Sequence, residues 1–144
     1  MQELTLHYMK NIDKGGLLML IKRKKIEKIM KIIDKLRDQN FNILTQYKFI
    51  QIAKALENEQ DILQEQISSL IIDYGERDEQ EHLIQDESKG IKIKKEYLKE
   101  CSQKIYDIYE LNIQMPDIYF SFDELDSLNL TLGELELLEP FIKE

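Results

Sequence analysis

Hydrophobic residues recur at helical intervals along one uninterrupted stretch, Ile43 to Tyr74, which contains neither Gly nor Pro and is followed by Gly75. One series recurs at every seventh position: Phe49, Leu56, Leu63 and Leu70. A second series lies four places after each of these: Ala53, Gln60, Ile67 and Tyr74. Intervals of four and three place them on one narrow seam, as in a coiled coil. The pattern predicts one helix of roughly 45 Å. We expect Asn42 to be its N-cap and Gly75 to end it in the left-handed conformation.

Two shorter segments carry the same helical period, and we expect both to pack antiparallel against the long helix. The first extends from Lys24 to about Asp38 and has the apolar residues Ile26, Ile29, Met30, Ile33 and Leu36. The second extends from about Lys94 to Leu111 and has the seam residues Leu98, Cys101, Ile105 and Ile108. Residues 76–90, which connect the long helix to the second segment, are polar and are expected to form a loop or a loose hairpin.

Short apolar runs on either side of these helices predict a small β element. Residues 18–22 suit a strand, and Ile118–Phe120 follows Pro116, which fits an edge strand. We expect these two runs to pair in a sheet of two or three strands. Ser121 and Thr131 each begin a Ser/Thr-x-x-Glu sequence, the signature of a helix-capping box. The expected fold class is therefore mainly α, with a long central helix, two shorter antiparallel helices, a minimal sheet and a capped helical C-terminal tail.

Residues 1–18 differ from the rest because they show no sustained period and are interrupted by Lys14-Gly15-Gly16. The sequence from Lys14 to Met19 can be encoded by a purine-rich stretch containing GGAGG shortly before an ATG. That order is typical of a bacterial ribosome-binding site, so Met19 is one candidate for the native start, and an ordinary flexible arm is the alternative. We expect residues 19–144 to form a single helical domain.

Composition excludes several classes of protein. The chain has 144 residues, of which 42% are hydrophobic and 33% charged, as expected of one folded domain with its own core. No apolar run approaches the roughly 20 residues that span a bilayer, so no membrane role is expected. A single cysteine excludes an internal disulfide and a multi-cysteine zinc site, and it fits a reducing cytoplasm.

The net charge of −8 is unevenly distributed. Residues 22–37 hold eight basic side chains against two acidic ones, and residues 122–144 hold seven acidic side chains against Lys143 alone. One helix face presents Lys24, Lys28, Lys31 and Lys35. This face is a candidate for phosphate contacts with nucleic acid. The reading we favour is a solvated face, or one that pairs with the acidic tail or a partner, because the sequence pI is about 4.9 and no aromatic residues interleave with these lysines.

Candidate chemistry is sparse. His82 lies among five acidic residues, but their spacing is not that of a calcium-binding loop, so we interpret the segment as a solvated acidic loop. Cys101 falls on a helix seam, which indicates a small core residue rather than a nucleophile. The sequence has no glycine-rich phosphate loop, nucleophile elbow or His-Glu-x-x-His motif. We therefore expect a non-enzymatic protein with no cofactor and no metal site.

Four residues are candidates for a partner interface. Gln60 interrupts the long seam with an amide, which either fixes the register with a second copy or marks a locally uncovered seam. Tyr97, Tyr106 and Tyr109 flank the seam of the last long segment rather than filling it. Tyrosines in such places complete a core or anchor an interface.

The order of features resembles a known group of proteins. A short strand and helix precede a long helix that ends in IIDYGERDEQ, and then come KGIKIKKEYLKE, an apolar strand and the tail LTLGELELLEPFIKE. This order is similar to that of small helix-rich proteins of unknown function encoded by tailed phages of low-GC Gram-positive bacteria. The resemblance covers residues 19–144 and implies a phage or prophage origin, in the host cytoplasm or associated with the virion, with no catalytic residues to assign.

The functional expectation is a non-enzymatic accessory protein that binds a phage or host protein, or a second copy of itself. Two alternatives remain at this point. One is a nucleic-acid-binding regulator that uses the Lys22–Arg37 basic helix face, and the other is an acidic inhibitor of a host enzyme.

Overall fold

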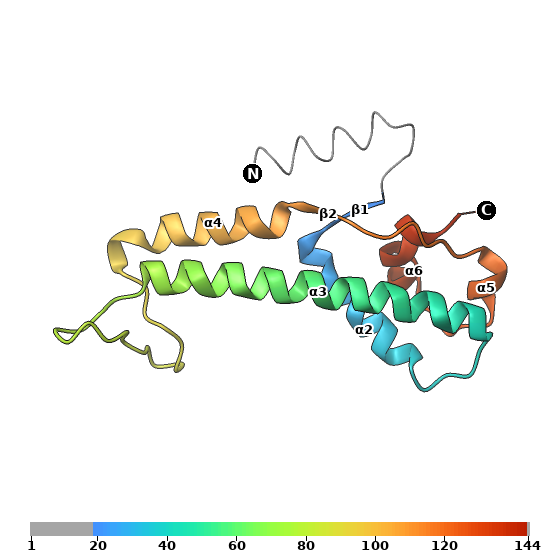
Figure 1. The fold of residues 1–144 in the computed structure, drawn as a ribbon, viewed down its shortest axis with the longest axis horizontal. Helices are drawn as coiled ribbons and strands as arrows, with labels where there is room; N and C mark the ends of the chain where they lie inside the picture. The colour runs from blue at the N-terminus through green and yellow to red at the C-terminus, as the bar shows by residue number, and fades with distance from the viewer. Residues whose placement is uncertain (1–18, 144) are drawn as a thin grey trace, which may run out of the picture.

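The computed structural model describes residues 19–143 and is mainly α-helical with a small β element (Figure 1). Helix α3 (Ile43–Tyr74) is unbroken and runs along most of the molecule. Helices α2 (Ile26–Leu36) and α4 (Leu98–Glu110) pack against it and run antiparallel to it. The predicted fold class is thus confirmed. The suggested start at Met19 and the N-terminal arm concern residues 1–18, which lie outside the described residues.

The boundaries of the long helix agree with the sequence, but the reason for its C-terminal glycine differs. Asn42 caps the N-terminus as predicted, because its side chain accepts a hydrogen bond from the Leu44 N–H at 2.9 Å. The predicted left-handed Gly75 is wrong, since this residue is extended, with φ −67° and ψ 141°. A Cβ atom on Gly75 would lie 2.6 Å from Leu83 Cδ2 and 2.9 Å from Ile91 Cγ2. Gly75 is therefore needed for close approach of the following loop.

The hydrophobic core surrounds the first half of α3. It contains the apolar face of α2 predicted from the sequence, together with Phe49, Ile52 and Leu56 of α3 and residues of the C-terminal tail. We call this part of the molecule the head (residues 19–56 and 112–143). The remaining part, the arm (residues 57–111), consists of the second half of α3, a loop and α4 (Figure 1).

The small sheet forms with a different partner from the one predicted. Strand β1 (Leu20–Lys22) pairs antiparallel with β2 (Asn112–Gln114), and Ile21 lies opposite Ile113. The predicted pairing of β1 with residues 118–120 is wrong, because β2 follows α4 directly and buries Ile113 against the core before Pro116 is reached. Phe120 instead forms a parallel bridge with Ile142.

The C-terminal tail contains α5 (Phe122–Asp126), α6 (Leu132–Leu138) and the 3₁₀ turn η3 (Glu139–Phe141). Both predicted capping boxes are present, at Ser121 and Thr131. Each box carboxylate also binds a lysine of the head. Glu124 pairs with Lys48 at 2.8 Å, and Glu134 pairs with Lys35 at 2.6 Å. The acidic C-terminal tail is thus fastened to α2 and to the first half of α3 within one chain.

Two 3₁₀ turns precede the shorter helices, η1 (Arg23–Lys25) before α2 and η2 (Lys95–Tyr97) before α4. The loop that joins α3 to α4, which we call the tip (residues 75–94), is a meander closed by isolated bridges between Gly75 and Ile93, 77 and 83, and 85 and 91. Asp78 and Asp86 cap its two turns by accepting backbone hydrogen bonds from residues two and four places ahead. This meander corresponds to the loose hairpin expected from the sequence.

Candidate protein interface

The arm is only two helices thick, and its seam is incompletely covered. Leu63 and Cys101 are buried, but Leu70, Ile105 and Ile108 are only half-buried, and Leu98 is 50% exposed. α2 packs on the first half of α3, whereas the second half packs on α4. A two-helix layer buries one stripe of each helix and leaves the flanking apolar positions accessible to solvent.

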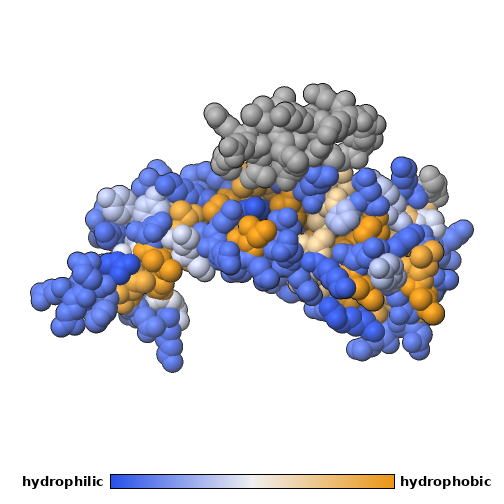
Figure 2. All heavy atoms as spheres, in the orientation of Figure 1, coloured by the Kyte–Doolittle hydropathy of each residue, from blue (hydrophilic) through white to orange (hydrophobic). Residues whose placement is uncertain are grey.

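Large apolar side chains lie on the surface of this arm. They include Ile62, Ile72, Tyr97, Leu98 and Tyr106, of which Tyr106 is 59% exposed. Figure 2 shows hydrophobic surface along the line where α3 and α4 meet. Single exposed apolar residues are ordinary on protein surfaces, but a series along one pair of helices is typical of a binding surface.

An open groove of about 550 Å³ lies between the two helices of the arm. It is lined by Gln66, Ser69, Leu70, Lys104, Asp107, Ile108 and Leu111. On α3, Ile62, Gln66, Ser69 and Asp73 share one face because they are spaced by four, three and four residues. On α4, Lys104, Asp107 and Leu111 share one face for the same reason. The two faces meet at the groove, which has an apolar floor and charged residues on the α4 side.

Arg23 lies at the end of the groove nearest the head. It directly follows β1, its backbone N–H donates to the Leu111 carbonyl at 2.9 Å, and it is only 6% exposed. One terminal guanidinium nitrogen donates to Gln66 Oε1, which is a neutral acceptor, and Nε has no partner among the described residues. Buried charges in proteins are normally paired with an opposite charge. Arg23 is therefore a buried cation to which the described part of the chain supplies only an amide.

The lysines on either side of Arg23 both form ion pairs with Glu110. Lys22 and Lys24 place their Nζ atoms 2.8 and 2.7 Å from the two carboxylate oxygens of Glu110. Hydrogen bonds from these two lysines lower the pKa of Glu110 to about 2. This pair of contacts holds the C-terminus of α4 to η1 and so fixes the arm to the head.

The four interface residues predicted from sequence do not form one cluster. Tyr97 lies near the tip and packs on Tyr74 with the two rings tilted and their centroids 5.6 Å apart. Gln60 is half-buried and lies fourteen residues before Tyr74, about 21 Å away along the helix. Tyr106 is exposed and Tyr109 is half-buried on α4. None of the four lines the groove, and their role in an interface stays a prediction.

Sequence reasoning missed the groove and its buried arginine. The spacing of Lys104, Asp107 and Leu111 is visible in the sequence. Prediction from the buried seam alone did not include the helix face beside it. Arg23 stood within a run of basic residues, where nothing distinguishes a buried side chain from exposed ones. Its burial follows from the pairing of β1 with β2, which sequence reasoning assigned incorrectly.

The basic face of α2 is largely engaged within the chain. Lys24 pairs with Glu110, Lys35 pairs with Glu134, and Lys31 lies 3.4 Å from Glu27 one turn before it. These contacts match the reading in which the face pairs with acidic parts of the same fold. They leave fewer free cations for a phosphate backbone than the sequence alone indicates.

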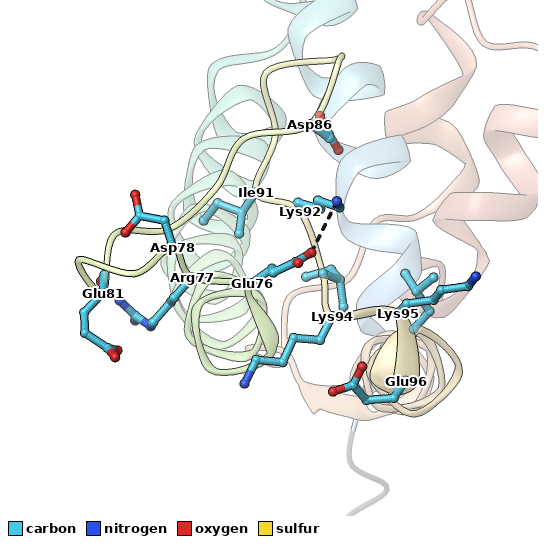
Figure 3. A pocket seen from close by; sticks show the side chains of 12 residues that line it. Glu76, Arg77, Asp78, Glu81, Asp86, Ile91, Lys92, Lys94, Lys95 and Glu96 are labelled. Carbon is cyan, nitrogen blue, oxygen red and sulfur yellow. Dashed lines mark hydrogen bonds and ion pairs between the residues drawn. The ribbon is translucent and has the colours of Figure 1, made fainter.

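A hollow of about 920 Å³ lies at the tip of the arm (Figure 3). In it, Lys92 pairs with Glu76 at 3.4 Å, while Asp78 and Glu81 lie at one edge and Asp86 at another. The carboxylates do not converge on one point. Among the described residues, no three His, Cys, Asp or Glu side chains are grouped so as to hold a metal ion.

Cys101 is buried in the arm, and burial raises the pKa of its thiol. A thiol that stays protonated at neutral pH is a poor nucleophile. Its position on the helix seam is that predicted from the sequence.

A second apolar surface lies on the head. A groove of about 410 Å³ between α2 and α3 is lined in part by Ile33, Phe41 and Phe49, and the first turn of α3 exposes Ile43 and Leu44 beside it. Arg23 Nε is the only buried side-chain nitrogen or oxygen without a partner among the described residues, so this groove lacks the unpaired buried charge that distinguishes the groove of the arm.

Within residues 19–143, no helix is both long enough and apolar enough to cross a membrane. Comparison with known proteins found no family whose model matches the chain, no curated protein similar to it and no solved structure that matches its fold.

Proposed function

We propose that this chain is a non-enzymatic accessory protein of a phage or prophage that works in the host cytoplasm by binding another protein through its arm. The observation that carries the proposal is the two-helix arm, whose apolar seam and adjacent groove have no third layer of the described chain over them. The phage origin rests on the resemblance of residues 19–144 to small phage proteins.

The surface chemistry of the arm suits a helical protein partner. Antiparallel helices with apolar residues at intervals of three and four bury their remaining faces when a third or fourth helix packs beside them. Charged residues such as Lys104 and Asp107 alternate in sign along the rim of the groove, so a partner is positioned in one register rather than held by general attraction.

Site-specific photo-crosslinking tests this proposal in cells that make the full chain. A photoreactive phenylalanine analogue replaces Leu98 or Ser69 on the arm and, as a matched control, Asp38, which is an exposed residue of the head. We expect discrete protein adducts from both arm positions and none from Asp38. Arm positions that form no more adducts than Asp38 would contradict the proposal.

A further inference from the structure

We propose that a second copy of this chain occupies the groove of the arm, with the two arms antiparallel so that α3 faces α3 and α4 faces α4. The inference rests on the proposed protein-binding function and names the partner. The resulting assembly is a four-helix bundle related by a two-fold axis that crosses the arms near Ser69 and between Lys104 and Asp107.

The size of the arm is sufficient for such an interface. The part of α3 beyond the head, about 18 residues, is roughly 27 Å long, and two adjacent helices present a face about 20 Å wide. A face of these dimensions contributes on the order of 600–800 Å² of accessible surface per copy, close to the amount found in stable protein interfaces. Ile62, Leu70 and Ile108 lie on or beside this face and are only partly buried in one copy.

The charges along α4 are complementary to themselves under this symmetry. A two-fold axis between Lys104 and Asp107 places each lysine opposite the aspartate of the other copy, and it does so twice. In one copy, Lys104 lies over the Tyr74 ring at 5.1 Å and Asp107 accepts a hydrogen bond from the amide of Gln103 at 2.9 Å. Within one copy each charge is held by an uncharged partner, and an ion pair with the other copy supplies the opposite charge.

The same axis places a carboxylate at the end of the groove where Arg23 lies. Arg23 contacts Gln66, which lies three residues before Ser69, and Asp73 lies four residues after Ser69 on the same helix face. Rotation about an axis near Ser69 brings Asp73 of one copy to the level of Gln66 and Arg23 of the other. Arg23 Nε is enclosed within one copy, so Asp73 of the other copy acts on this buried guanidinium as a nearby opposite charge beside the Gln66 amide that holds it.

Reversing the charges of Lys104 and Asp107, first singly and then together, tests the register of the two arms. Sedimentation equilibrium of the full chain at micromolar concentration is expected to show a dimer. Lys104→Asp and Asp107→Lys should each raise the dimer Kd by about tenfold or more, because each places like charges opposite one another. The double variant should return the Kd to near the value of the unaltered chain. Lys54→Glu reverses a charge on the head and is the matched control, so it should leave the dimer Kd unchanged.

A cysteine placed on the axis tests the geometry independently. Ser69→Cys should form an intermolecular disulfide under mild oxidation, because the two copies of this residue face each other. Asn58→Cys, which is exposed on the same face of α3 but lies eleven residues, about 16 Å, from the axis, should not. The unaltered chain controls for Cys101, which is buried.

The outcomes separate this inference from the function on which it rests. A monomer at all concentrations, or single and double charge variants with equal Kd values, would overturn the second copy as partner. If arm crosslinks to a different protein then persist, the proposed function stands. If no arm crosslink forms, both fail.

Discussion

At the scale of single residues, two glycines near helices have different structural roles. Gly75 has a backbone conformation open to any residue, and it is required because Leu83 and Ile91 approach its Cα closely. Gly133 lies in α6, and a Cβ at this position would meet nothing within 4 Å. Sequence reasoning identifies both as glycines near helices but cannot distinguish a glycine needed for space from one that only adds backbone freedom.

Substituting these two glycines by alanine should change stability in opposite directions. Gly75→Ala should destabilise the protein by about 1–3 kcal/mol, because the new methyl group forces the tip away from the end of α3. Gly133→Ala should stabilise it by about 0.5–1 kcal/mol, because alanine has less conformational freedom to lose in a helix. Urea unfolding of both variants checks the prediction, and two changes of the same sign would contradict it.

Glu124 joins more partners than any other carboxylate of the tail. It accepts hydrogen bonds from Lys48, from the buried Thr45 hydroxyl and from the Ser121 N–H, and these lower its pKa, Lys48 most of all. Glu124→Ala should reduce the free energy of unfolding by about 2–3 kcal/mol, because it leaves Thr45 and Lys48 without their acceptor and removes the carboxylate half of the capping box. The control, Asp123→Ala, is exposed and should cost less than about 1 kcal/mol. Equal losses in thermal unfolding would refute this role.

At the scale of elements, the hydrophobic period was sufficient to predict the helices and their packing on α3, but not the pairing of the strands. The seam from Phe49 to Tyr74 and both capping boxes lie within short stretches of sequence, so local chemistry determines them. Pairing of β1 with β2 depends on where α4 ends in space, about ninety residues away along the chain. No local signal carries that information, and the burial of Arg23 was missed for the same reason.

The junction between η1 and α4 should respond to acid. The folded-state pKa of Glu110 is about 2, below its ordinary value of 4.5. Because the folded state lowers this pKa, the contribution of Glu110 to stability is full above pH 4.5 and is lost as the pH falls towards 2. The Glu110→Gln variant should therefore lose less stability than the unaltered chain over this range. Urea unfolding at a series of pH values measures it, and identical pH dependence of the two proteins would contradict the assignment.

At the scale of the whole molecule, hydrophobic residues form a buried core in the head and a partly exposed seam in the arm. In the head, two helices, the sheet and the tail bury a continuous core, and ion pairs such as Lys48–Glu124 fasten the last segment to the first. In the arm, the same seam continues without a third layer, although the side chains remain apolar. A helix that extends past its own core needs cover from elsewhere, which is why we assign the arm to binding.

Hydrogen–deuterium exchange of the full chain at increasing protein concentration tests this division most directly. In dilute solution, we expect amides of α3 beyond Leu56 and of α4 to exchange faster than those of α2 and the first half of α3. As the concentration rises, exchange in the arm should slow while exchange in the head stays constant. If the arm exchanges as slowly as the head in dilute solution, and concentration changes neither, the arm is not an open binding surface and the account is wrong.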